Sequence, residues 1–146
     1  MTGRDSCCSP QPKRAKKKDE CCCAANQVSI VLACSGGSNV GQITNEVAKR
    51  LDEAGEAKFF CLAGVGGCVS GMVASVKGAD WVLVLDGCPV GCAKKCVDKA
   101  GISNYGYLVV TELGIEKKHA FDLSEKDLET ALAAARAKLV SGSRTA

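Results

Sequence analysis

The sequence predicts a single three-layer α/β domain, in which a mostly parallel sheet of about four strands carries helices on both faces. Strand-like and helix-like segments alternate four times along residues 27–146. The strand-like segments are short and apolar, as strands buried on both faces are. With 146 residues, 47% of them hydrophobic and 24% charged, the chain has the size and composition of one globular domain.

The first strand and helix are predicted over the segment that ends at Gly55. Residues 27–34 form a β-branched run that indicates a buried strand. Ser38 or Asn39 can cap a following helix, and Gly55 can end it. Within that helix, apolar side chains recur at helical spacing: Val40, Ile43, Val47 and Leu51.

The same alternation continues in the middle of the chain. Residues 57–62 predict a second strand, and the glycines within 64–67 predict a turn. A short helix is predicted over 68–77. Residues 80–86 are apolar without alternation, which is typical of a central parallel strand.

The last elements are a helix, a strand and a second helix. Pro89 suits the first turn of a helix that ends at Gly101. Residues 105–111 predict the fourth strand, and Ser124 opens the final helix. One face of that helix is apolar: Leu128, Leu132, Ala135 and Leu139.

Residues 1–26 form a separate polar arm that contains cysteine and lysine clusters but no apolar periodicity. We expect the arm to be disordered when unliganded. It carries six basic and three acidic side chains, which accounts for the whole net charge of +3 and leaves the domain at 27–146 neutral. Its cysteines are either incidental or an accessory metal-capture segment. A neutral domain with 4% aromatic residues argues against a nucleic-acid partner.

The chain contains 11 cysteines, which is the outlier of its composition. Cysteine this dense occurs in secreted disulfide scaffolds and in intracellular thiol sites. Met1 to Ala25 has no apolar core of the kind a signal peptide needs, and no apolar run approaches the roughly 20 residues that span a bilayer. We therefore expect a cytoplasmic protein, without a membrane partner, whose cysteines bind or react.

Four cysteines are predicted to meet at one edge of the sheet. Cys34 ends the first strand, Cys61 ends the second, and Cys88 follows the third by two residues. Cys92 lies one helical turn beyond Cys88. Because ligands of open parallel sheets bind at the carboxyl ends of the strands, these thiols are candidates for a common site. A helix N-terminus favours thiolate at Cys88 and Cys92.

The neighbouring residues leave alternatives open. Each cysteine alone is also compatible with simple packing; Cys96 can replace Cys61 or pack its helix, with packing favoured, and Cys68 is a weaker candidate ligand. Asp86 either orients the loop as an acceptor or forms an ordinary Asx turn, and the turn is favoured. We expect His119 to be solvated.

The segment that begins at Cys34 also has the layout of a cysteine-phosphatase loop. Such loops place an arginine beside the cysteine, whereas the next basic residues here are Lys49 and Arg50, at the far end of the helix. Phosphoryl transfer is therefore poorly supported. The glycine-rich segment 64–67 likewise lacks the Lys-Ser/Thr of a P-loop.

Three motifs in order resemble the DGC-domain family, which is named for its Asp-Gly-Cys and associated with zinc binding. The motifs begin at Cys34 (CSGGSNVGQ), Cys61 (CLAGVGG) and Asp86 (DGCPVGCAKKC), and the resemblance covers roughly Val28 to Lys118. It implies a zinc site of four cysteines, carried onto Cys34, Cys61, Cys88 and Cys92.

Three functions follow as hypotheses. The first is a zinc-binding protein with a structural or metal-trafficking role and no turnover. The second is a thiol redox or sulfur-transfer enzyme that uses Cys34 or Cys88 as its nucleophile. The third is an iron–sulfur protein with the same ligands. The metal ion is the one partner that the sequence indicates.

Overall fold

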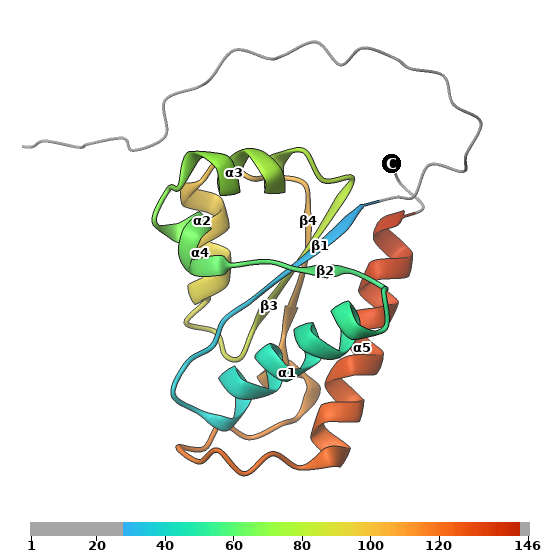
Figure 1. The fold of residues 1–146 in the computed structure, drawn as a ribbon. Coiled ribbons are helices and arrows are strands. Elements are labelled where there is room, and N and C mark those ends of the chain that lie inside the picture. The colour runs from blue at the N-terminus through green and yellow to red at the C-terminus, as the bar shows by residue number, and fades with distance from the viewer. Residues whose placement is uncertain (1–27, 144–146) are drawn as a thin grey trace, which may run out of the picture.

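The computed structural model describes residues 28–143, which form a four-stranded sheet between two helical layers (Figure 1). The strand order is β2-β1-β3-β4, and every neighbouring pair is parallel. The strands are β1 (Ser29–Ala33), β2 (Lys58–Phe59), β3 (Trp81–Asp86) and β4 (Tyr105–Val109). The helices are α1 (Asn39–Glu53), α2 (Leu62–Gly66), α3 (Ser70–Lys77), α4 (Cys92–Lys99), α5 (Glu125–Ser143) and the 3-10 turn η1 (Val110–Leu113). The predicted fold class is confirmed.

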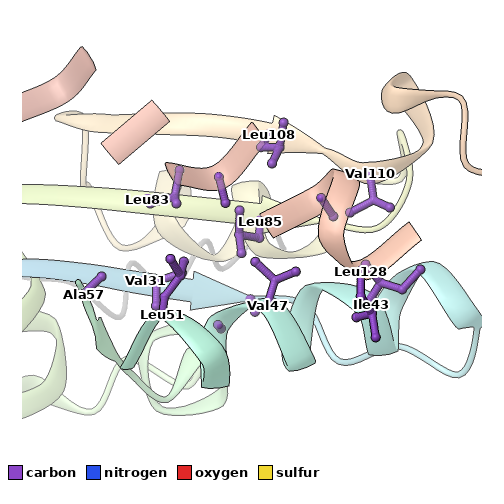
Figure 2. Close-up of a cluster of buried hydrophobic side chains, with 14 of the residues drawn as sticks. Val31, Ile43, Val47, Leu51, Ala57, Leu83, Leu85, Leu108, Val110 and Leu128 are labelled. Carbon is purple, nitrogen blue, oxygen red and sulfur yellow. The ribbon is translucent and has the colours of Figure 1, made fainter. Parts of the chain in front are cut away.

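Alternate residues of the central strands enter two different cores. Val31 and Leu83 pack in the core beneath α1 and α5, whereas Ile30 and Val82 pack in the core beneath α2, α3 and α4. Figure 2 shows the first core, where side chains of β1 and β3 meet Leu51 and its neighbours on α1. Burial on both faces explains why these strands read as continuous apolar runs rather than alternating ones.

Helix α1 begins and ends where the sequence predicts. The Ser38 side chain accepts a hydrogen bond of 3.3 Å from the backbone amide of Gly41, which caps the first turn. Gly55 follows the helix with a φ of +70°, the left-handed conformation that glycine adopts without strain. The four predicted apolar positions are all buried in the first core: Val40, Ile43, Val47 and Leu51.

Two predicted segments differ around the second strand. The prediction of a glycine-rich turn over 64–67 is wrong, because the segment forms helix α2. Val65 is completely buried in the second core, so tertiary packing stabilises a helix that two glycines would disfavour on their own. Strand β2 is correspondingly short, since the chain enters α2 directly after Cys61.

Helix α4 also starts later than predicted. Its first residue is Cys92, so Pro89 lies in the preceding turn rather than in the first helical turn. Gly91 occupies the N-cap position with a φ of 67°, a left-handed conformation, and therefore offers no capping side chain. The fourth strand ends at Val109 and continues as η1.

Helix α5 packs as predicted through Leu128, Ala135 and Leu139, whereas Leu132 is partly buried. No helix within residues 28–143 combines the length and the hydropathy that a membrane crossing requires. The predicted arm, residues 1–26, lies outside the described part of the chain.

Candidate functional site

Cys34 lies at the carboxyl edge of the sheet, immediately after β1. Its backbone amide donates to the carbonyl of Leu85 on β3 at 2.9 Å, which holds the end of β1 against β3. Its sulfur accepts a hydrogen bond of 3.2 Å from the backbone amide of Gly87. The Cys34 thiol therefore lies directly against the turn that carries Cys88.

Thr44 of α1 supports Cys34 from the other side. The Thr44 hydroxyl donates to a backbone carbonyl, either that of Cys34 or that of Gly41, and its Oγ1 lies 3.7 Å from the Cys34 sulfur. In this contact between the thiol and the hydroxyl, either group can be the donor. Burial raises the pKa of the Cys34 thiol, against the lowering effect of the Gly87 amide.

Gly87 fits only because it has no side chain. A Cβ atom there would lie 2.8 Å from the backbone nitrogen of Gly41 and from the carbonyl carbon of Val40. A Cβ on Gly41 would in turn lie 2.8 Å from the backbone of Gly36. At these glycines the backbones of three segments are in direct contact: the turn after β3, the first turn of α1 and the loop after β1. This contact brings the loops of Cys34 and Cys88 together.

Asp86 is the buried acid of the site, with 1% of its surface exposed. Its Oδ1 accepts from the Ala93 amide at 2.8 Å, and its Oδ2 accepts from the Lys94 amide at 2.9 Å and from the Tyr107 hydroxyl at 3.2 Å. The carboxylate thus caps α4 in place of the missing N-cap side chain and fixes the start of the helix at Cys92. The favoured prediction of an Asx turn is wrong, because the Asp86 carboxylate accepts from amides of α4 instead. Its predicted alternative role as an acceptor agrees with these contacts to that extent.

Tyr107 of β4 closes this network. Burial raises the pKa of its hydroxyl, and the neighbouring Asp86 carboxylate raises it further. A protonated hydroxyl is the form that donates to a carboxylate. Asp86 and Tyr107 therefore tie together β3, β4 and the beginning of α4.

Cys88 is half-buried and has a partner that sequence reasoning missed. The Lys117 ammonium donates to the Cys88 sulfur across 3.5 Å. The sequence gives only a weak signal for a role of Lys117, because residues 116–119 have the composition of a charged, solvated segment. The prediction that His119 is solvated is confirmed, because the residue is exposed; its Nδ1 also lies 2.7 Å from the carbonyl oxygen of Gly37.

The two remaining predicted ligands are exposed. Cys61 occupies the N-cap position of α2, just beyond β2, and Cys92 is the first residue of α4. Both therefore lie at the carboxyl edge of the sheet, as the topology requires.

Cys96 and Cys68 have different surroundings. A Cβ on Gly66 would lie 2.8 Å from the Cys96 sulfur, so this thiol packs α4 against α2, as the favoured prediction has it. Burial raises the pKa of Cys96, and the neighbouring Cys92 and Asp86 raise it further. Cys68 lies between α2 and α3 with a left-handed φ of 57°.

The donor set agrees with zinc in chemistry but not in spacing. Thiolates are the ligands that zinc prefers in closed sites, and the sulfurs of Cys34 and Cys88 each receive an N–H donor that helps to balance their charge. As the side chains stand, however, residues 28–143 bring no three His, Cys, Asp or Glu close enough together to hold a metal ion.

Fold and site together define a parallel α/β domain that carries thiols at the carboxyl edge of its sheet and an Asp-Gly-Cys turn at the centre of that edge. The chain belongs to the DGC domain family, whose model matches residues 30–135. The anaerobic and virulence modulator AnvM of Pseudomonas aeruginosa is 40% identical to it over 100 residues, which cover 68% of this chain and 76% of AnvM. No solved structure matches the chain.

Proposed function

We propose that this DGC-domain protein binds one zinc ion through the thiolates of Cys34, Cys61, Cys88 and Cys92, in a structural or metal-trafficking role. The observation that carries the proposal is the arrangement around Gly87. Its amide holds the sulfur of Cys34, and the next residue, Cys88, receives the Lys117 ammonium. Two soft donors are thus supported at neighbouring positions by groups that stabilise sulfur charge.

Zinc binding then has to draw the exposed thiols inward. Cys61 is the N-cap residue of α2 and Cys92 is the first residue of α4, so both lie where the chain leaves the carboxyl edge of the sheet. Both are exposed, so their side chains have room to turn. A site that closes only around the ion suits a protein that must also release it, which favours trafficking over a permanent structural role.

Metal analysis of purified, reduced protein tests the proposal. We expect about one tightly held zinc per chain. Cys88→Ser and Cys92→Ser should lower zinc retention much more than Cys96→Ser, because Cys96 packs against Gly66. Cys68→Ser serves as a second comparison. Far less than one equivalent of any transition metal in folded wild-type protein, or equal loss in all four variants, would refute the proposed ligand set.

Thiol redox chemistry is the second candidate, and the ammonium at Cys88 favours it. Cys88 is better placed as the reacting sulfur than Cys34, whose pKa is raised by burial. When a Cys88–Cys92 disulfide forms, the two thiols are oxidised and their two hydrogens pass to an oxidant such as oxidised glutathione, which becomes two reduced glutathione molecules. The relative AnvM is named for anaerobic modulation, and a thiol site in a reducing cytoplasm fits oxygen-linked regulation. Reversible loss of two hydrogens from the peptide that contains both cysteines would support this candidate over zinc.

A further inference from the structure

The segment that follows η1 is fastened to the loop of Cys34 by one buried side chain. Asn39, at the start of α1, donates its Nδ2 to the carbonyl of Glu116 at 2.9 Å and accepts from the Lys118 amide at 2.6 Å through Oδ1. Its own backbone amide donates to the Lys118 carbonyl at 3.0 Å. Asn39 thus holds the backbone on both sides of Lys117.

The contacts of Asn39 connect two parts of the chain that are distant in sequence. The hydrogen bonds of the Asn39 side chain reach backbone groups that lie 77 and 79 positions further along the chain, and Asn39 is only 8% exposed. Figure 1 shows the chain before α5 passing beneath the amino-terminal end of α1. His119 adds a second attachment through the Gly37 carbonyl. The backbone of 116–119 is therefore held firmly, although its side chains are exposed.

The charged side chains of residues 116–118 have two kinds of partner: another charged side chain at the surface, or the Cys88 thiol. Glu116 and Lys118 pair with each other, with 3.2 Å between the Lys118 ammonium and the Glu116 carboxylate. Lys117, between them, directs its ammonium at the Cys88 sulfur instead. The two adjacent lysines therefore have different partners, and only Lys117 serves the thiol.

From this geometry we infer that Lys117 is a positioning residue of the thiol site. Its ammonium contacts the Cys88 sulfur and offsets negative charge of the ligand set, and Asn39 is the residue that places Lys117 there. The inference rests on the proposed zinc function and deepens it. A four-thiolate zinc site carries a formal charge of −2, and a fixed ammonium against one sulfur reduces the repulsion that the ligands exert on one another.

The first test measures local charge in metal-free protein. Cys88 is alkylated with iodoacetate, which is anionic, and separately with iodoacetamide, which is neutral, and the ratio of the two rates is taken by peptide mass spectrometry. The thiolate fraction cancels in this ratio, so the ratio reports the field at the sulfur. Lys117→Met should lower the ratio about threefold, as removal of a unit charge a few ångströms away predicts. Lys117→Arg should preserve it.

Lys118→Met is the matched control, because it removes the same charge from the adjacent residue. It should leave the ratio near that of wild type. Asn39→Ala should lower the ratio even though Lys117 is present, with far-UV circular dichroism to confirm folding. If Asn39→Ala does not fold, the Lys117 variants still decide the matter. Equal ratios in Lys117→Met and Lys118→Met would overturn the inference.

The second test measures zinc transfer to a chelator from protein loaded with zinc alone. Lys117→Met should release zinc several-fold faster than wild type, whereas Lys117→Arg and Lys118→Met should not. A lowered alkylation ratio with unchanged zinc release would also overturn the inferred role. If the wild-type protein holds no zinc, the proposed function fails by itself, and the alkylation ratio still decides whether Lys117 is the charge partner of Cys88.

Discussion

The backbone amide of Gly87 donates to the sulfur of Cys34 across 3.2 Å. This contact assigns a separate physical task to each residue of the Asp-Gly-Cys turn. Asp86 caps α4, Gly87 allows the turn to touch α1 and holds Cys34, and Cys88 faces Lys117. The turn, which itself carries Cys88, therefore connects the loop of Cys34 with helix α4, which carries Cys92, and its replacement should affect both.

Replacement of Gly87 by alanine should destabilise the domain by about 1–3 kcal/mol, because its Cβ would have to displace the backbone of α1. Urea unfolding measures the change. Gly37→Ala is the control, since nothing lies within 4 Å of a Cβ at that position. It should change stability by no more than about 0.5 kcal/mol. Equal costs at both glycines would contradict the close approach described here.

Asp86→Asn should also destabilise the domain, by about 1–3 kcal/mol, because an amide can no longer accept from both α4 amides and Tyr107 at once. It should also lower zinc retention, since Cys92 loses its fixed helix start. Asp98→Asn is the matched variant on the exposed face of α4, where the carboxylate binds Lys94 and Tyr105. A smaller effect is expected there, and the reverse order would contradict the capping role.

Stability should fall in acid through two ion pairs of α1. Lys49 lowers the pKa of Glu46, and Arg50 lowers the pKa of Glu125, both from an ordinary value of 4.5. A lowered folded-state pKa gives stability that is present above the unfolded value and lost as the pH falls through the folded one. Thermal melts between pH 6 and about pH 3 should therefore show a declining midpoint.

Arg50→Gln should flatten this acid dependence, because it removes the partner of Glu125. Lys58→Gln is a suitable control, since Lys58 lies at a longer distance, 3.9 Å, from Asp52. High salt should weaken the dependence in the wild-type protein, because the pairs are exposed. An unchanged acid limb in Arg50→Gln would show that other groups govern it.

Removal of residues 1–26 should leave the stability of the domain nearly unchanged, because a polar segment without apolar periodicity buries little apolar area. Tight zinc should persist, whereas total zinc bound from excess metal should fall if the arm captures metal. A chelator competition with and without the arm makes the comparison. Loss of the tight zinc would instead show that cysteines of the arm complete the site.

The sequence was sufficient for the parts of the fold that obey local rules. Strands buried on both faces and the helix stripe of α1 leave strong hydrophobic patterns, and parallel topology alone places Cys34, Cys61 and Cys88 at one edge. Helix α2 was missed because its glycines oppose a helix locally, and only the burial of Val65 stabilises it.

The finer parts of the site depend on distant contacts that no local pattern encodes. Asp86 reaches the amides of α4 seven and eight residues away, around the turn that precedes the helix. Lys117 meets Cys88 across 29 positions, and its charged neighbours make it resemble ordinary surface. Side-chain partners of this kind have to be seen in three dimensions.

The Asn39 fastening also sets an order of events during synthesis. It joins Asn39 to Lys118, 79 positions further along the chain, so it can form only after β3 and β4 have been synthesised. Cys34, Cys61 and Cys88 all leave the ribosome before Lys117 does. The nascent protein therefore carries the Cys88 thiol for a period without the ammonium that faces it in the folded domain.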